Sequence, residues 1–208
     1  AMDYYKTTDW PEGWTMLDSA LVIDPNFALA SLDRWHPDPD IRTKNRKKAY
    51  SLMNEVSSAE KYILKSNQFG DAGNSDSALY NIQKLVEENP ESYEAYNRLG
   101  FVYGGRKEML LSEKAYKKAI ELNPDNYEAY TRLCGQHIMY GFYHILPEDN
   151  RDIEKGREYT EKLIELKPNR AHGHHFKANS FRQTAEFKKA IPLYDRAIEL
   201  SKGTDSEA

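Results

Sequence analysis

The chain has 208 residues, of which 30% are charged and 39% hydrophobic, and its formal net charge at pH 7 is −4. This length suits one sizeable domain or about five or six stacked units of roughly 34 residues. The acidic balance argues against general nucleic-acid binding, which usually needs a basic face. A single cysteine, Cys134, excludes an internal disulfide framework and a Cys-rich metal site.

No apolar run approaches the roughly 18 residues of a membrane span, and no charged-then-apolar leader is visible. We therefore expect neither a membrane nor a nucleic acid as partner. A cytoplasmic location is the expectation, although a secreted or periplasmic chain whose leader has been removed would look the same.

The first segments of the chain are the least regular. Residues 1–27 read as a partial helical unit, and residues 28–58 as an irregular one. Two prolines within three residues predict a loop over 36–40, with a basic helix from about residue 42. Ser57 and Glu60 have the spacing of a capping box, so a new helix is expected near residue 58.

The unit 59–92 reads as two helices separated by a turn. Its segment 70–75 is rich in turn-forming residues, and Asn74 or Ser75 is the expected cap of the second helix. Lys65 stands where the two following units have leucine. We expect either looser packing there or a lysine stem that lies along the core with its charged head in water.

The most regular unit is 93–126, with the sequence YEAYNRLGFVYGGRKEMLLSEKAYKKAIELNPDN. Apolar residues at helical spacing predict one helix before a Gly-Gly break and a second, amphipathic helix that ends at Pro124. The next unit begins with YEAYTRL, almost repeating YEAYNRL. One helical hairpin cannot bury its apolar face alone, so neighbouring units must stack on it.

The unit 127–168 is longer than a standard repeat, and its extra length falls in the aromatic segment 140–150. We expect an extended first helix and then a loop from Pro147 to about residue 152. Insertions in repeat proteins map to loops on one face, often the binding face. Tyr140, Phe142 and Tyr143 are therefore candidate contacts with a partner, and the alternative is that these rings cover the adjacent unit.

The unit 169–202 keeps the apolar pattern but carries Lys177 at the leucine position. Residues 203–208 resemble the start of a further repeat, or a tail. With the partial unit at the start, this predicts a segment of a larger array or an array with incomplete ends.

The chain resembles the tetratricopeptide repeat (TPR) family. The residues that carry the resemblance are Tyr96, Leu99, Gly100, Tyr103, Ser112, Tyr116, Ala119 and Pro124. The resemblance implies an all-α, right-handed superhelical solenoid of antiparallel helix pairs, a single solenoid over 1–208 with about five repeats. Cys134 takes a small-residue position, so packing is its expected role.

The function that the resemblance implies is a non-catalytic scaffold for protein–protein interaction. It would bind a peptide segment or partner helix in a concave groove lined by the first helices. The alternative is the sensory or regulatory repeat arm of a larger bacterial signalling enzyme or transcription regulator. Self-association through terminal repeats is a further hypothesis, because uncapped repeats expose apolar faces.

The family pattern also implies which residues face the groove. They are Asn67, Asn97, Arg98, Phe101, Arg132, His175, Asn179 and Arg182. Arg98 and Arg132 repeat one position and predict a short arginine ladder that pairs with an acidic segment or a C-terminal carboxylate. The alternative is that Glu94 and Glu128 neutralise them. The carboxylate clamp of chaperone-binding members is not reproduced, since Arg98 stands where asparagine is needed.

Catalytic and metal sites are not indicated. The sequence has no Gly-rich phosphate loop, nucleophile elbow or zinc-protease helix motif, so we expect no catalytic residue and no cofactor. His172 and His175 share a helix face one turn apart, a spacing that supplies two imidazole ligands. A third ligand is not visible and His174 falls at an aromatic position, so we predict no metal site.

Overall fold

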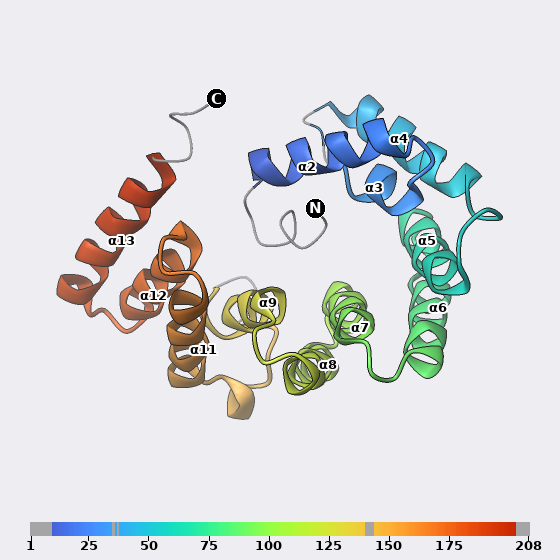
Figure 1. The fold of residues 1–208 in the computed structure, drawn as a ribbon. Helices are drawn as coiled ribbons and strands as arrows, with labels where there is room; N and C mark the ends of the chain where they lie inside the picture. Colours follow the sequence, from blue (N-terminus) through green and yellow to red (C-terminus); the bar gives the residue numbers. More distant parts are fainter. Residues whose placement is uncertain (1–9, 35, 37, 140–143, 203–208) are drawn as a thin grey trace. The chain divides into compact units, whose positions relative to one another are not determined.

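A computed structural model describes residues 10–34, 36, 38–139 and 144–202. Every element within those residues is helical, and no strand occurs among them. The chain divides into two compact units, 1–102 and 103–208, with helix α7 across the boundary (Figure 1). The predicted insertion contacts Tyr140, Phe142 and Tyr143 lie outside the described residues, as do segments 1–9 and 203–208.

The first unit is built around one apolar core. Its helices are α2 (Trp10–Ile23), α3 (Ala28–Asp33), α4 (Pro39–Ser51), α5 (Ser58–Asp71), α6 (Ser75–Glu88) and most of α7 (Tyr93–Gly105). Buried side chains from α3 to α7, among them Leu32, Leu64, Ile82 and Ala95, pack together. The α5–α6 hairpin therefore forms the middle of this core, with α3 and α4 before it in the chain and α7 after it.

The second unit continues the pattern of helix pairs. It contains the end of α7, then α8 (Met109–Leu122), α9 (Tyr127–Ile138), the 3-10 turn η1 (Glu148–Asn150), α11 (Ile153–Leu166), α12 (Ala171–Gln183) and α13 (Phe187–Lys202). Its core joins α9, α11 and α12 through Cys134, Ile138, Leu163 and Phe176. Cys134 is fully buried, which confirms its packing role, and burial raises the pKa of its thiol.

Two glycines set how closely the helices of this unit approach. A Cβ atom on Gly156 would lie 2.6 Å from Cγ1 of Ile138, and one on Gly173 would lie 2.7 Å from Cγ1 of Ile164. No real Cβ atom tolerates such distances without a shift of its neighbour. Glycine at these positions allows α9, α11 and α12 to form one tightly packed group.

Three hairpins turn in the same way between their two helices. One residue after each first helix adopts a left-handed backbone: Gly73, Lys107 and Ala185, with φ of 75°, 62° and 59°. The next N–H donates to the carbonyl five residues back: from Asn74 to Phe69, from Glu108 to Tyr103 and from Glu186 to Phe181, at 2.8, 3.0 and 2.8 Å. This is the Schellman ending of a helix. The turns are alike in backbone although their side chains differ.

Two helix ends confirm the predicted caps. Ser57 accepts from the N–H of Glu60, whose carboxylate accepts from the N–H of Ser57, and together they complete the capping box of α5. Asn74 caps α6 by accepting from the N–H of Ser77. Side-chain spacing alone was sufficient to locate these two helix starts.

Two other helix ends were predicted wrongly. α4 begins at Pro39 rather than near residue 42, because proline is tolerated in the first turn and Asp38 accepts from the N–H of Asp40. The first helix of unit 127–168 is not extended: α9 ends at Ile138, and Met139 has an extended backbone. Ile138, the last residue of α9, is fully buried and packs against Gly156 of α11.

Candidate protein-interaction site

Four of the predicted groove residues lie in the first unit, and most of their polar groups are already engaged. The Asn67 amide donates to the carbonyl of Ile63 at 2.9 Å, and Asn97 is only 3% exposed. Arg98 lies 3.8 Å from the carboxylate of Asp33. Phe101, by contrast, is 57% exposed. Phe101 is the most exposed of the four predicted residues in this unit.

The predicted arginine ladder involves both units. Arg132, on α9, has its guanidinium 3.9 Å from the carboxylate of Glu128, as the neutralisation alternative expects. Arg98 pairs with Asp33 rather than with Glu94. Because Arg98 and Arg132 belong to different units, their side-by-side arrangement stays a prediction.

In the second unit, three further predicted groove residues lie on α12: His175, Asn179 and Arg182. Together with His172 they follow each other at helical spacing on one face, which we call the α12 stripe. His175 and Arg182 are exposed, whereas Asn179 is buried. The Asn179 amide nitrogen lies 3.2 Å from Nε2 of His175, and the Tyr194 hydroxyl donates to the Asn179 carbonyl oxygen at 2.8 Å. A tyrosine of α13 thus holds the middle of the stripe in place.

The charge of α12 differs from that of the acidic chain as a whole. From Leu166 to Ala185 the sequence contains no Asp or Glu. Partial burial of the imidazole rings, with smaller contributions from neighbouring basic groups, lowers the pKa of both His172 and His175 from the ordinary 6.5. Both imidazoles are therefore neutral at pH 7, and Arg182 supplies the positive charge of the stripe.

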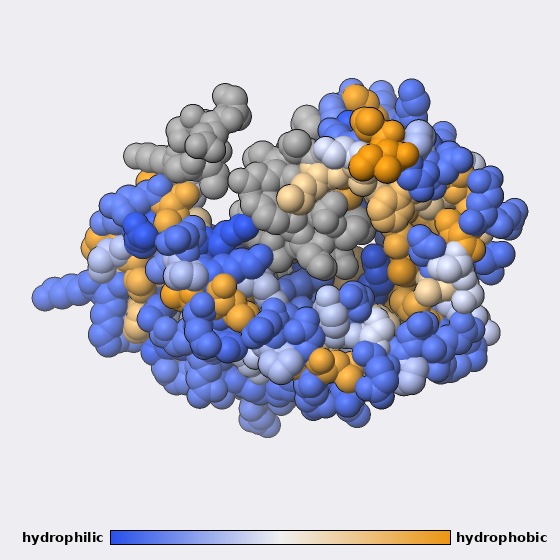
Figure 2. Space-filling view, viewed as in Figure 1, coloured by the Kyte–Doolittle hydropathy of each residue, from blue (hydrophilic) through white to orange (hydrophobic). Residues whose placement is uncertain are grey.

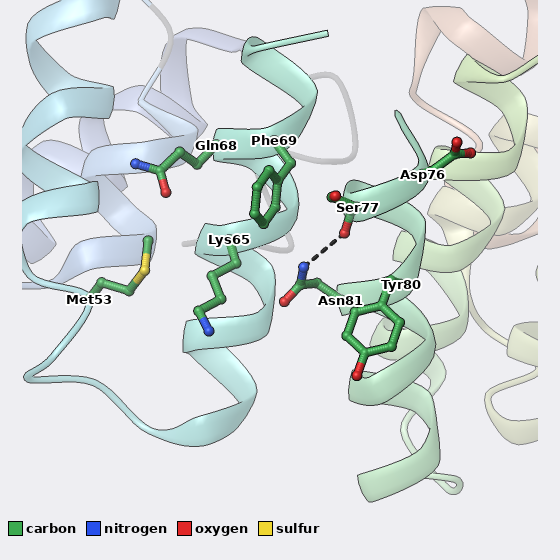
Figure 3. A pocket seen from close by; sticks show the side chains of 8 residues that line it. All are labelled: Met53, Lys65, Gln68, Phe69, Asp76, Ser77, Tyr80 and Asn81. Carbon is green, nitrogen blue, oxygen red and sulfur yellow. Dashed lines mark hydrogen bonds between the residues drawn. The ribbon is translucent and has the colours of Figure 1, made fainter. Parts of the chain in front are cut away.

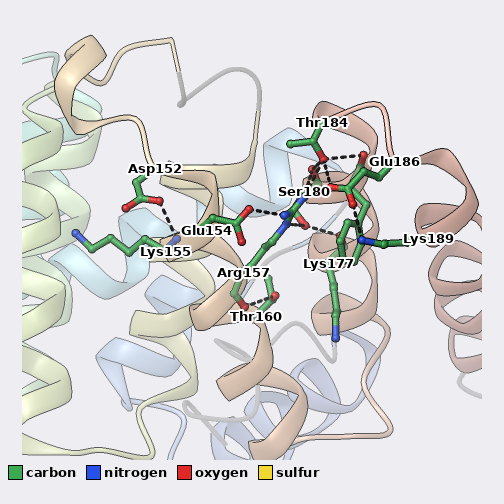
Figure 4. A network of polar contacts seen from close by, with 11 residues as sticks. Asp152, Glu154, Lys155, Arg157, Thr160, Lys177, Ser180, Thr184, Glu186 and Lys189 are labelled. Atoms are coloured by element: carbon green, nitrogen blue, oxygen red, sulfur yellow. Dashed lines mark hydrogen bonds and ion pairs between the residues drawn. The ribbon is translucent and has the colours of Figure 1, made fainter.

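Arg157 of α11 braces the end of α12 and the start of α13 (Figure 4). Its guanidinium donates to the hydroxyls of Ser180 at 3.2 Å and Thr184 at 2.8 Å, and to the carboxylate of Glu186 at 2.9 Å. It also stacks on the Phe181 ring, 4.4 Å from the ring centroid. Lys189, Thr184 and Arg157 together lower the pKa of Glu186 to about 2. The network therefore holds α11, the end of α12 and the start of α13 together next to the α12 stripe.

A second buried polar cluster joins α8, α9 and α11. The Glu113 carboxylate accepts from Lys117 at 2.6 Å and from Lys155 at 2.7 Å, and Nε2 of the buried His137 lies 3.7 Å away. His137, Lys117 and Lys155 hold the pKa of Glu113 well below its ordinary 4.5. Both lysines pair with Glu113, so these three charged side chains are engaged with one another within the unit.

The first unit contains a pocket between α5 and α6 that the sequence did not predict (Figure 3). Its volume is about 510 Å³, and it is lined by Met53, Lys65, Gln68, Phe69, Asp76, Ser77, Tyr80 and Asn81. None of these residues occupies a predicted groove position. The unusual lysine at position 65 was the one signal of it in the sequence.

The predicted histidine pair gains no third ligand. His174 is engaged with the carbonyl oxygen of Pro168 at 3.0 Å. Among the residues that the structure describes, no group of three or more His, Cys, Asp or Glu side chains is placed to hold a metal ion. Within the same residues, no helix combines the length and the apolar character that crossing a membrane requires.

Comparison with known proteins supports the fold. The tetratricopeptide repeat model matches residues 93–126. A structure described as "MamA MSR-1 C2" covers 90% of this chain and 99% of its own at 16% identity, with a TM-score of 0.59. "Crystal structure of MamA" covers 82% and 99% at 21% identity, with a TM-score of 0.60. A comparison with curated proteins finds no significant match.

Similarity to MamA at these identities concerns the fold alone. The fold itself agrees with the repeat: helix pairs, recurring Schellman turns and an apolar core shared between neighbouring pairs. Stacked helix pairs of this type form scaffolds for protein interaction. The predicted all-α helical repeat is confirmed, and residues 93–126 match the tetratricopeptide repeat itself.

Proposed function

We propose that this chain is a non-catalytic scaffold whose first helices bind an acidic peptide segment of a partner protein. The α12 stripe is its main contact in the second unit. The observation that carries the proposal is the exposed Arg182 on a stretch without any acidic residue, in a chain of net charge −4. Within the described part of the chain no ion pair neutralises Arg182, so its guanidinium is available to a carboxylate.

The neighbours of Arg182 make the stripe a preorganised surface. Tyr194 donates to Asn179, and the His175 and Tyr194 rings lie 6.0 Å apart, so α13 restrains the stripe before any ligand arrives. Restraint of this kind lowers the entropy lost on binding. A carboxylate held by Arg182 can accept a further hydrogen bond from the exposed His175.

The remaining predicted residues extend the same proposal. Helix α9 contacts α12 within the second unit, so Arg132 is the next basic side chain, with Glu128 competing against a peptide for it. In the first unit Phe101 offers an exposed ring for an apolar side chain. Asn67, Asn97 and Arg98 have smaller roles, because their polar groups are bonded or buried within the unit.

Fluorescence anisotropy with labelled peptides rich in Glu and Asp tests this proposal, with the same peptides carrying Gln and Asn as controls. We expect the acidic peptides to bind with about micromolar Kd, roughly −8 kcal/mol. Arg182→Glu should weaken that binding about tenfold or more, because it replaces attraction by repulsion. Arg196→Glu, on α13 and paired with Glu199, is the matched charge-reversal control.

Equal binding of acidic and neutral peptides would contradict the proposal. So would equal binding by wild type and Arg182→Glu, provided that circular dichroism shows both to be folded. The two outcomes separate a general lack of acidic preference from an acidic site elsewhere on the chain.

The histidines of the stripe give the proposal a pH dependence. Their pKa values are lowered from the ordinary 6.5, so the histidines are neutral at pH 7 and add positive charge to the stripe as the pH falls. Binding of an acidic peptide should therefore tighten between about pH 7.5 and about pH 5.5, while its carboxylates remain ionised. His175→Gln should reduce this tightening, and anisotropy titrations across that range measure it.

We also propose that α13 can associate with a second copy of the chain. This amphipathic helix exposes three large apolar side chains: Phe187, Ile191 and Ile198 are 57%, 59% and 52% exposed. Elsewhere the molecular surface is largely hydrophilic, with scattered apolar patches (Figure 2). Light scattering across a concentration range should show the average mass rising for wild type but not for Ile191→Lys/Ile198→Lys. A constant monomer mass for wild type would contradict this second proposal.

A further inference from the structure

The pocket between α5 and α6 coincides with a departure from the repeat pattern. The position held by Lys65 is leucine in the two following repeats, Leu99 and Leu133, and Leu133 is fully buried. A lysine keeps its charged head out of an apolar core. Lys65 is partly exposed on the wall of a pocket of about 510 Å³, where a leucine would pack into the hairpin.

The ammonium group of Lys65 lacks the partner that its counterpart has. Lys177 occupies the same position in the α12–α13 hairpin, and its Nζ pairs with the Glu161 carboxylate at 2.5 Å. No carboxylate within the described ranges lies at ion-pair distance from Lys65. Asp76 also lines the pocket, but Figure 3 shows its carboxylate at the opposite end from the lysine head. The pocket therefore presents an uncompensated positive charge.

The other walls of the pocket are largely aromatic and amide groups. Phe69 comes from α5 and Tyr80, which is 58% exposed, from α6 (Figure 3). The Asn81 amide nitrogen donates to the carbonyl oxygen of Ser77 at 2.8 Å, and this hydrogen bond restrains the Asn81 side chain in the pocket wall. Small-molecule sites have volumes of about 300–1,000 Å³ and combine apolar walls with a few polar groups. The volume of this pocket lies in that range, and its walls combine the Met53, Phe69 and Tyr80 side chains with polar groups.

We propose that the α5–α6 pocket is a separate binding site for a small organic acid with an aromatic or aliphatic body. Lys65 pairs with its carboxylate, and Phe69 and Tyr80 pack against its body. The same chemistry is presented by a free carboxylic acid and by the last residue of a peptide. The proposal is independent of the α12 stripe, because the pocket lies in the other unit and uses none of the predicted groove positions.

Two probes that differ only in charge test the site on the full chain. N-acetylphenylalanine carries a free carboxylate, and N-acetylphenylalaninamide has the same body without it. In NMR titrations we expect the acid to shift the backbone amide signals around Lys65, Phe69 and Tyr80, and the neutral amide to bind about tenfold more weakly. No shift with the acid, or equal affinity for both probes, would overturn the proposal.

Variants at the lysine position complete the test. Lys65→Met should abolish the preference for the acid while leaving an apolar pocket. Lys61→Met, on the same helix but outside the pocket, and Lys177→Met, at the same repeat position, should bind as wild type does. Lys65→Leu should likewise abolish the preference for the acid. Retained acid preference in Lys65→Met or in Lys65→Leu would refute the site.

The source of the acid is distinguished by extending the probe at its N-terminus. A short peptide that ends in a free phenylalanine should bind more tightly than N-acetylphenylalanine if the pocket receives a peptide end. Unchanged or weaker binding of the peptide, with the acid preference kept, assigns the pocket to a free small acid. Both results support the site, and loss of the dependence on Lys65 in either series overturns it.

Discussion

The hairpins α5–α6 and α12–α13 have the same backbone turn and the same unusual lysine, yet their surroundings differ. In the first hairpin Lys65 borders an open pocket, and the turn contains Gly73. In the second hairpin Lys177 is paired with Glu161, and Arg157 holds the turn through hydrogen bonds. The repeat pattern sets the backbone of both hairpins. The segment before each hairpin decides whether its lysine is paired, which we call a closed hairpin, or borders a pocket, which we call an open one.

One helix accounts for the difference. Arg157 and Glu161 both belong to α11 and are four residues apart, so one face of α11 supplies the brace and the counter-charge. The segment before α5 supplies Met53 to the pocket of the first hairpin. The closed hairpin therefore holds a surface stripe rigidly, whereas the open one leaves room for a ligand.

Removing the brace should produce the largest effect on this comparison. Arg157→Ala is expected to lower the free energy of unfolding by about 2–3 kcal/mol, since Ser180, Thr184 and Glu186 lose a charged donor. Urea unfolding measures the loss, and hydrogen exchange should show it concentrated in α12 and α13. Arg196→Ala removes an exposed pair and should cost at most about 0.5 kcal/mol. An equal loss of unfolding free energy in the two variants would show that the Arg157 hydrogen bonds do not stabilise the turn.

A methyl group at Gly173 should have the next largest effect. Gly173→Ala places a Cβ atom 2.7 Å from Ile164, so the α11–α12 contact must shift at a cost of about 1–3 kcal/mol. Gly70→Ala is the matched change in α5, where nothing lies within 4 Å, and alanine there should stabilise the helix by about 0.5–1 kcal/mol. Thermal unfolding of both variants checks the opposite signs. Destabilisation by both changes would mean that packing does not distinguish the two helices.

The two turns should respond in opposite directions when their left-handed residues are exchanged. Ala185→Gly relieves a positive φ and should stabilise the chain by about 0.5–1 kcal/mol, whereas Gly73→Ala should destabilise it by a similar amount. The midpoint of urea unfolding is the measurement. A stabilised Gly73→Ala variant would contradict the assignment of the same turn to both hairpins.

The smallest expected effect is a pH dependence at the braced turn. The pKa of Glu186 is lowered to about 2 from 4.5, so its stabilising contribution is present above the ordinary value and is lost as the pH falls towards the lowered one. Glu186→Gln should therefore be less stable than wild type at neutral pH. This difference in stability should disappear as the pH falls from 4.5 to about 2. Thermal unfolding of both proteins at several pH values tests this. A gap that is independent of pH would exclude the ionised carboxylate as the cause.

The helical repeat and several caps could be predicted from sequence because they depend on local spacing. The 34-residue unit 93–126 is matched as a tetratricopeptide repeat, and Ser57 and Asn74 cap the helices expected of them. The start of α4 was missed because a proline at the first helical position looks like a loop signal in sequence.

The contacts that shape the candidate site could not be predicted in the same way. Arg157 bonds to residues 23 to 29 positions later in the chain, and no local pattern distinguishes it from a solvated helix arginine. Asn179 was placed on the correct helix, but its burial under Tyr194 depends on how α13 packs. The pocket had one local signal, Lys65, whereas its volume depends on three separate segments of the chain.

The most direct test of the proposed function is a charge exchange between Arg182 and its ligand. Anisotropy would compare wild type and Arg182→Glu, each with an acidic peptide and with the same peptide carrying Lys in place of its acidic residues. The proposal predicts that wild type prefers the acidic peptide and that Arg182→Glu loses this preference and gains affinity for the basic one. An unchanged preference in the folded variant would contradict recognition of acidic segments by the α12 stripe.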